Sequence, residues 1–205
     1  MPQSQNNKDL HGNVPDRSRT ALLLVDVIND LDFPGNEEVV KISKTLGKSI
    51  LALKKRCTRA GVPVIYVADN RGRWQSDSTS VVKAAMRRRM PGRVLTRILN
   101  PGPNDYIVLK PRHSAFYATP LQTILEYLGA KTLIIAGLAT ESCVMLAAGE
   151  AFVLDYQIIV PCDCVAGLNM SMHSNALRLM EDNLHADIRP WKDLNLRSLK
   201  SRTHR

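Results

Sequence analysis

The sequence predicts an α/β fold with three layers, in which helices cover both faces of a mostly parallel, Rossmann-like sheet of about six strands. Short apolar runs of strand length alternate with helical patterns along most of the chain. Such alternation favours parallel strands that are joined by right-handed crossover helices. A chain of 205 residues can form one domain with a substantial core.

The first half of the chain contains three expected strands, over 21–26, 62–68 and 105–109. Each is rich in Val, Ile and Leu, as strands buried on both faces of a parallel sheet are. Helical patterns over 37–60 and 80–90 lie between them. This order predicts two crossover units.

The second half continues the alternation. In chain order we expect a helix over 119–128, a strand from 133, a helix that begins around 143, a strand over 157–161, a helix over 171–183 and a last edge strand over 186–189. The domain is expected to span 20–190. We expect a flexible N-terminal arm over 1–19 and a basic C-terminal tail over 191–205.

The net charge is +9, and residues 192–205 contribute five bases against one acid. A basic surface can bind nucleic acid, but the chain lacks the interleaved aromatic and basic residues of such sites, so a nucleic-acid partner is not expected. No apolar run has the length of a membrane span, and the first twenty residues do not read as a secretory signal. We therefore expect a cytoplasmic protein without a membrane partner.

Four cysteines in a chain this long do not form a disulfide scaffold. Cys162 and Cys164 have no companion pair at zinc-finger spacing. We interpret these two residues and Cys57 as reduced structural thiols, which suits a reducing compartment.

Cys143 is the exception, because it lies where an apolar strand leads into a helix. Gly137, Thr140 and Ser142 suit a tight turn and a helix start. Free backbone amides and the helix dipole at such a place can lower the pKa of a thiol and make it a nucleophile. The alternative is that Cys143 is a small buried residue of the core.

Two further candidates end other strands. Asp26 follows the first strand, where parallel sheets bind ligands, although an Asp can equally cap the next turn. Lys110 ends the third strand, and a Lys there is costly unless it pairs with an acid or extends to the surface. His113 follows in a loop, either as an acid/base or as a histidine with one hydrogen bond. Trp74 could border a pocket or a subunit contact.

Asp26, Lys110 and Cys143 are expected at the same end of the sheet, and their chemistry is complementary. Asp26 can accept the thiol proton, while Lys110 can stabilise the thiolate and orient the carboxylate.

These residues stand in three motifs, at 23–30, 110–116 and 137–144, whose order and spacing resemble the isochorismatase-like cysteine hydrolases over roughly 20–190. That superfamily includes nicotinamidases and N-carbamoylsarcosine amidohydrolase. The resemblance implies that Asp26, Lys110 and Cys143 form the catalytic triad. It also implies a cis peptide between Leu138 and Ala139, an oxyanion hole of the Ala139 and Cys143 amides, and a homo-oligomer (a dimer or tetramer).

Some positions depart from the family pattern. The stretch 69–74 contains no histidine, whereas nicotinamidases bind a metal there, so we expect neither a metal nor a cofactor. Isochorismatases lack the nucleophilic cysteine, so Cys143 argues against vinyl-ether cleavage. Glu141 and Leu31 stand where many relatives have Asp and Phe.

The sequence therefore predicts a metal-independent hydrolase that cleaves a small amide or carbamoyl substrate through a thioester. The expected pocket walls are aromatic: Phe33, Trp74, Phe116 and Tyr117. The alternative function is a catalytically degenerate α/β scaffold that binds a partner through its basic surface or tail.

Overall fold

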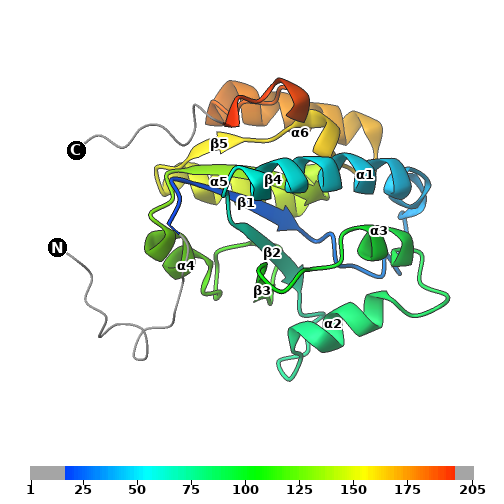
Figure 1. Ribbon diagram of the computed structural model, residues 1–205. Helices are drawn as coiled ribbons and strands as arrows, with labels where there is room; N and C mark the ends of the chain where they lie inside the picture. Colours follow the sequence, from blue (N-terminus) through cyan, green and yellow to red (C-terminus); the bar gives the residue numbers. More distant parts are fainter. Residues whose placement is uncertain (1–16, 197–205) are drawn as a thin grey trace, which may run out of the picture.

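The computed structural model describes residues 17–196 (Figure 1). Most of the expected arm (1–16) and much of the expected basic tail (197–205) lie outside these residues. None of the helices in residues 17–196 combines the length and the apolar composition of a membrane span.

The described residues form a parallel sheet of six strands (Figure 1). Its strands are β1 (Thr20–Val25), β2 (Val64–Asp69), β3 (Tyr106–Lys110), β4 (Thr132–Leu138), β5 (Gln157–Ile159) and β6 (Val165–Ala166). The spatial order is β3-β2-β1-β4-β5, and β6 pairs with the end of β4. The predicted parallel α/β sheet is confirmed.

Helices cover both faces of this sheet. They are α1 (Glu37–Arg59), α2 (Ser78–Ala85), α3 (Arg93–Ile98), α4 (Leu121–Leu128), α5 (Met145–Val153) and α6 (Met170–Leu184). Short 3₁₀ turns occur at Cys162–Cys164 and Trp191–Asp193, and a π-helical turn occurs at Thr140–Val144.

The alternation of side chains along β1 separates two cores. Leu22 and Leu24 pack with α1, α2 and α3 on one face, whereas Ala21, Leu23 and Val25 pack with α4, α5 and α6 on the other. All five side chains are fully buried, as expected for a central parallel strand. The three layers predicted from the sequence follow from this arrangement.

Two boundaries differ from the sequence prediction. The helix expected over 80–90 ends at Ala85, ahead of Pro91, and the separate helix α3 follows it. The edge strand expected over 186–189 is reduced to one parallel bridge between Ile159 and Asp187. Arg189 bonds to the Asp187 carboxylate instead of continuing a ladder, and Pro190 has no N–H to donate.

The order of strands places a crevice above β1 and β4. From β1 the chain proceeds to β2 and β3 on one side, and then returns to the other side of β1 with β4. Ligands of open α/β sheets bind at the carboxyl ends of the strands at such a switch point. Asp26 and Cys143 follow the two strands that flank it.

Candidate active site

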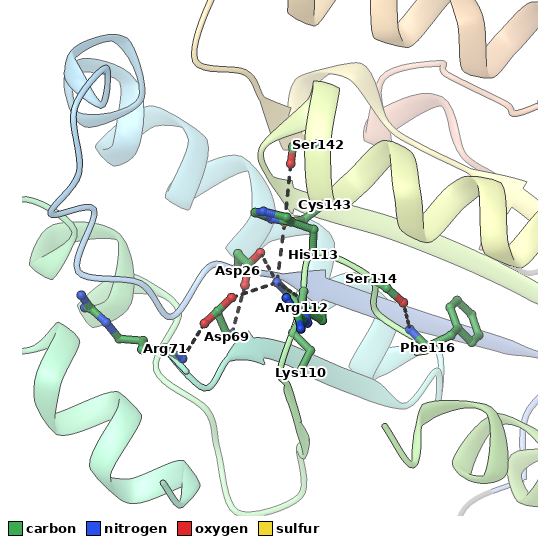
Figure 2. A network of polar contacts seen from close by, with 10 residues as sticks. All are labelled: Asp26, Asp69, Arg71, Lys110, Arg112, His113, Ser114, Phe116, Ser142 and Cys143. Carbon is green, nitrogen blue, oxygen red and sulfur yellow. Dashed lines mark hydrogen bonds and ion pairs between the residues drawn. The ribbon is translucent and has the colours of Figure 1, made fainter. Parts of the chain in front are cut away.

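The carboxyl ends of four strands bring the candidate side chains together (Figure 2). Asp26 follows β1, Asp69 ends β2, Lys110 ends β3, and Cys143 lies in the π-helical turn after β4. They belong to separate segments of the chain, so parallel packing of the strands places them side by side.

The backbone leaves β1 abruptly at Asp26. Its φ of 51° lies in the left-handed region, which non-glycine residues rarely adopt. On the neighbouring strand β4, Gly137 has a φ of 127°, and a Cβ there would lie 2.0 Å from the carbonyl oxygen of Val25. A glycine at 137 therefore allows β1 and β4 to approach closely just below the site.

Lys110 is the centre of the polar cluster, and its side chain has no exposed surface. Its Nζ lies 2.9 Å from Asp26 Oδ2, 3.5 Å from Asp69 Oδ2 and 3.6 Å from Cys143 Sγ. It also donates to the carbonyl oxygen of Arg112 at 3.1 Å. A buried ammonium with these partners satisfies the requirement that a buried charge be paired.

The charges in this cluster determine the protonation states. Burial raises the pKa of the Asp26 carboxyl, although Lys110 opposes this shift. Burial alone would lower the pKa of Lys110, but Asp26, Cys143 and Asp69 outweigh it and raise that pKa above its ordinary value. Lys110 is therefore charged at neutral pH.

Cys143 differs from the expectation that a helix start would lower its pKa. Burial and the nearby Asp26 carboxylate raise the pKa of the thiol to about 12, and Lys110 offsets only part of this. The expectation is wrong because the thiol is only 6% exposed. Burial and the negative charge of the neighbouring Asp26 both disfavour the thiolate. The resting thiol is protonated, within hydrogen-bonding reach of Asp26.

His113 is the residue whose place the sequence left most open. Its Nδ1 lies 3.4 Å from Cys143 Sγ, so its contact is with the candidate nucleophile. Ser142 Oγ lies 3.9 Å from the same sulfur. The sequence shows a histidine three residues after Lys110, but it does not show that the loop turns back toward the thiol.

The peptide between Leu138 and Ala139 is trans, as are all peptide bonds of residues 17–196, so the expected cis bond is not found. Ala139 has an extended backbone (φ −86°, ψ 145°) and leads directly into the π-helical turn. A non-proline cis bond costs about 3 kcal/mol, which this extended entry avoids. Ala139 and Cys143 both line the cavity above the cluster.

That cavity has a volume of about 490 Å³, within the usual range for small-molecule sites. Of the four aromatic residues expected to form its walls, Phe33 lines it. Phe116 is 9% exposed and packs in the core beside Tyr156, and its backbone N–H donates to Ser114 Oγ. Tyr117 (66% exposed) and Trp74 (79% exposed) do not line it.

Two parts of the cavity wall are not apparent from the sequence. An ion pair joins Arg71, in the loop after β2, to Asp30, in the loop after β1. The other part is apolar and belongs to α2: Val81, Ala84 and Ala85. The Asp77 capping box at the start of α2 is a sequence signal for this helix, but not for what it faces.

The described residues contain no group of three or more His, Cys, Asp and Glu side chains that could hold a metal ion. All four cysteines are unpaired. What the geometry offers is a buried thiol beside an acid that is itself paired with a lysine, at the base of a cavity.

A family model described as the isochorismatase domain matches residues 20–192. The chain belongs to the isochorismatase family. It is 36% identical over 168 residues to the uncharacterized isochorismatase family protein YaaI of Bacillus subtilis. The matched region covers 82% of this chain and 92% of YaaI. The membership makes the chain an isochorismatase-family hydrolase.

Two other relatives are informative. A probable inactive nicotinamidase of Arabidopsis thaliana is 27% identical over 165 residues, covering 76% of this chain and 84% of that protein. The N-carbamoylsarcosine amidase of Thermoplasma acidophilum superposes with a TM-score of 0.66 at 24% identity, covering 86% of this chain and 99% of the other. This structural likeness confirms the isochorismatase-like fold.

Proposed function

We propose that this isochorismatase-family hydrolase cleaves the C–N bond of a small carboxamide or carbamoyl compound, with Cys143 as nucleophile, Asp26 as base and acid, and Lys110 as the group that stabilises the thiolate. The observation that carries the proposal is the position of Lys110 Nζ, 2.9 Å from Asp26 Oδ2 and 3.6 Å from Cys143 Sγ. A thiol, an acid and a fixed positive charge are the parts that an activated nucleophile needs.

The first step moves the thiol proton from Cys143 to Asp26. The transfer keeps the total charge of the cluster constant, since a carboxylate and a thiol become a carboxylic acid and a thiolate beside the same ammonium. The raised pKa of Asp26 favours its acceptance of the proton. The thiolate then attacks the carbonyl carbon and forms a C–S bond.

We assign the stabilisation of the negative oxygen of the tetrahedral intermediate to the backbone amides of Ala139 and Cys143, because both residues line the cavity. As the C–N bond breaks, the proton on Asp26 passes to the departing amine or ammonia. Asp26 then takes a proton from water, whose oxygen attacks the thioester. The C–S bond breaks, and the proton returns to the sulfur, so the resting state is restored.

The names of two similar proteins support an amide substrate, because one is an amidase and the other is called a nicotinamidase. The second is described as probably inactive. This relative supports the alternative function, a catalytically degenerate scaffold. Its binding surface would include the groove at the end of α1, which Lys55, Arg56, Arg59 and Lys192 line.

The test uses the full chain and a panel of small primary amides and ureas, with ammonia release as the readout. Acid-quenched samples are measured by intact mass to detect an acyl group on Cys143. Ammonia release together with an acyl adduct that is absent from Cys143→Ala supports the hydrolase. No ammonia and no adduct with any member of the panel would favour the scaffold.

We further propose that the protein is a cytoplasmic homo-oligomer. Apolar side chains are exposed along α5 (Leu146, Phe152, Val153) and at α6 (Met170, Met172, Leu179), and a second copy would cover them. Light scattering coupled to size-exclusion chromatography gives the mass that tests this. A monomer at micromolar concentration would contradict it.

A further inference from the structure

The charges that line the cavity differ in sign from the charge of the whole chain, which is +9. Four carboxylates border the cavity: Asp26, Asp30, Asp32 and Asp69. Among the described residues that line it, Arg71 is the only Lys or Arg, and Lys110 lies buried behind Asp26. The site therefore keeps an excess of two negative charges when His113 is left out of the count.

Neither cation brings an uncompensated positive charge to the cavity. Lys110 is fully buried, and its ammonium is already shared between Asp26 and Asp69. Arg71 is paired with Asp30, whose side chain is only 9% exposed. If Arg71 left Asp30 to bind a substrate carboxylate, a nearly buried carboxylate would lose its partner, which is strongly unfavourable. If Arg71 kept Asp30, the pair would still offer the substrate no net positive charge.

Other basic side chains near the site do not compensate. Arg73 follows Arg71 in the same loop, and Arg87 and Arg88 follow α2, but all three are exposed and none lines the cavity. Asp32 is exposed at the cavity and has no ion pair within the described part of the chain. An anion that enters therefore approaches carboxylates without a matching positive charge.

The remaining wall is suited to an apolar group. Val81, Ala84 and Ala85 of α2 contribute small aliphatic surfaces, and Val39 and Leu168 add to them. Burial of hydrocarbon against such a wall is favourable, whereas burial of a charge there is costly.

From this arrangement we infer that the site selects uncharged substrates: a carboxamide or carbamoyl group on a neutral, apolar body, and not a carboxylate-bearing amide. The inference rests on the proposed function for the location of the reacting group. It adds that the carboxylates around Cys143 repel anionic substrates and so favour neutral ones. Repulsion by one uncompensated charge at about 8 Å is worth on the order of tenfold in kcat/KM near a protein surface.

The experiment compares substrates of equal shape and different charge. One pair is 4-methylpentanamide and succinamate, and the other is isobutylurea and N-carbamoylglycine. In each pair a carboxylate replaces an isopropyl group. In whichever pair the enzyme hydrolyses, we expect kcat/KM to be at least about tenfold higher for the neutral member than for the anionic one. This ratio of neutral to anionic kcat/KM should decrease as ionic strength rises from about 0.01 to 0.5 M, because salt screens charge.

Variants assign the selectivity to the cavity. Asp32→Asn should lower the ratio of neutral to anionic kcat/KM by about tenfold, since one repulsive charge is removed. The matched control is Glu181→Gln, which removes an exposed carboxylate on α6 outside the cavity and should leave the ratio unchanged. An equal effect of both variants would overturn the assignment to the cavity.

Binding to Cys143→Ala, measured by calorimetry with the same four compounds, tests the inference without turnover. Tighter binding of the neutral members supports it. Equal or tighter binding of succinamate and N-carbamoylglycine, or a higher kcat/KM for them, overturns it while the proposed hydrolase stands. Absence of ammonia from every amide, with no acyl group on Cys143, overturns the proposed function instead.

Discussion

Lys110 and Cys143 are 33 residues apart in the chain, yet Lys110 Nζ lies 3.6 Å from Cys143 Sγ. The two residues come from β3 and from the turn after β4, and β2 and β1 lie between those strands in the sheet. The Lys110 ammonium also lies 2.9 Å from Asp26 Oδ2, so it contacts both residues at once. Because the ammonium touches both partners, a change in either should alter the chemistry of the other.

Replacement of the nucleophile gives the first prediction. Cys143→Ala should reduce ammonia release by at least about a thousandfold, since it removes the atom that forms the thioester. Far-UV circular dichroism and the melting temperature should stay close to those of the parent protein, because a small side chain replaces another. Turnover that persists in this variant would contradict a cysteine mechanism.

Replacement of the base should separate reactivity from catalysis. In Asp26→Asn the thiol loses the neighbouring carboxylate that raises its pKa and keeps Lys110, which lowers it. We therefore expect iodoacetamide to label Cys143 faster at pH 8 than in the parent protein, while amide turnover is lost. Mass mapping of the four cysteines gives the labelling rates, with the buried Cys57 as the internal reference.

Amide turnover of variants distinguishes Asp26 from His113 as the base, since His113 also contacts the sulfur. His113→Gln should retain a substantial part of the activity if Asp26 is the base. Loss of turnover in His113→Gln, combined with activity in Asp26→Asn, would assign the proton transfer to the histidine.

The pH dependence of kcat/KM follows from the two shifted acids. Asp26 must be ionised to accept the proton, and burial raises its pKa above 3.8, so activity should fall as the pH decreases through that raised value. The thiol has a pKa of about 12, so no second transition from Cys143 is expected up to about pH 10. A profile that instead rises between pH 8 and 9, with the ordinary pKa of a thiol, would contradict this.

Loss of the buried lysine should affect stability as well as activity. Lys110→Met leaves the Asp26 carboxylate buried without its ammonium, and breaking a buried pair costs about 3–5 kcal/mol. The double variant Asp26→Asn/Lys110→Met should regain part of that free energy of unfolding, because the unpaired charge is gone. Urea denaturation of the parent, single and double variants measures the coupling; additive losses would mean that the two residues do not stabilise each other.

Gly137 lies where β1 and β4 approach closely, and Gly149 provides the control position for a Gly→Ala substitution. Gly137→Ala combines a φ of 127° with a Cβ that would lie 2.0 Å from the Val25 oxygen, so we expect severe destabilisation and loss of activity. Gly149 is in α5 with open space around its Cα, and Gly149→Ala should stabilise by about 0.5–1 kcal/mol. Thermal melts of the two variants should shift in opposite directions.

The parallel sheet, its flanking helices and the approximate ends of most elements could be predicted because they depend on local patterns. Apolar runs such as 21–25 and 133–137 mark buried strands without reference to the rest of the chain. Residues that follow such strands lie at one edge of a parallel sheet, so Asp26, Lys110 and Cys143 could be proposed as neighbours from their positions alone.

Other features depend on contacts between distant segments. The raised pKa of Cys143 comes from its burial and from Asp26 on another strand, which outweigh the local effect of a helix start. The wall of α2, the pairing of Arg71 with Asp30 and the approach of His113 to the thiol arise where loops fold over the crevice. The order of residues specifies which chemical groups end each strand. The charge states of these groups and the walls around them depend on the folded chain, because electrostatic and packing energies are set by distances between residues that are far apart in the sequence.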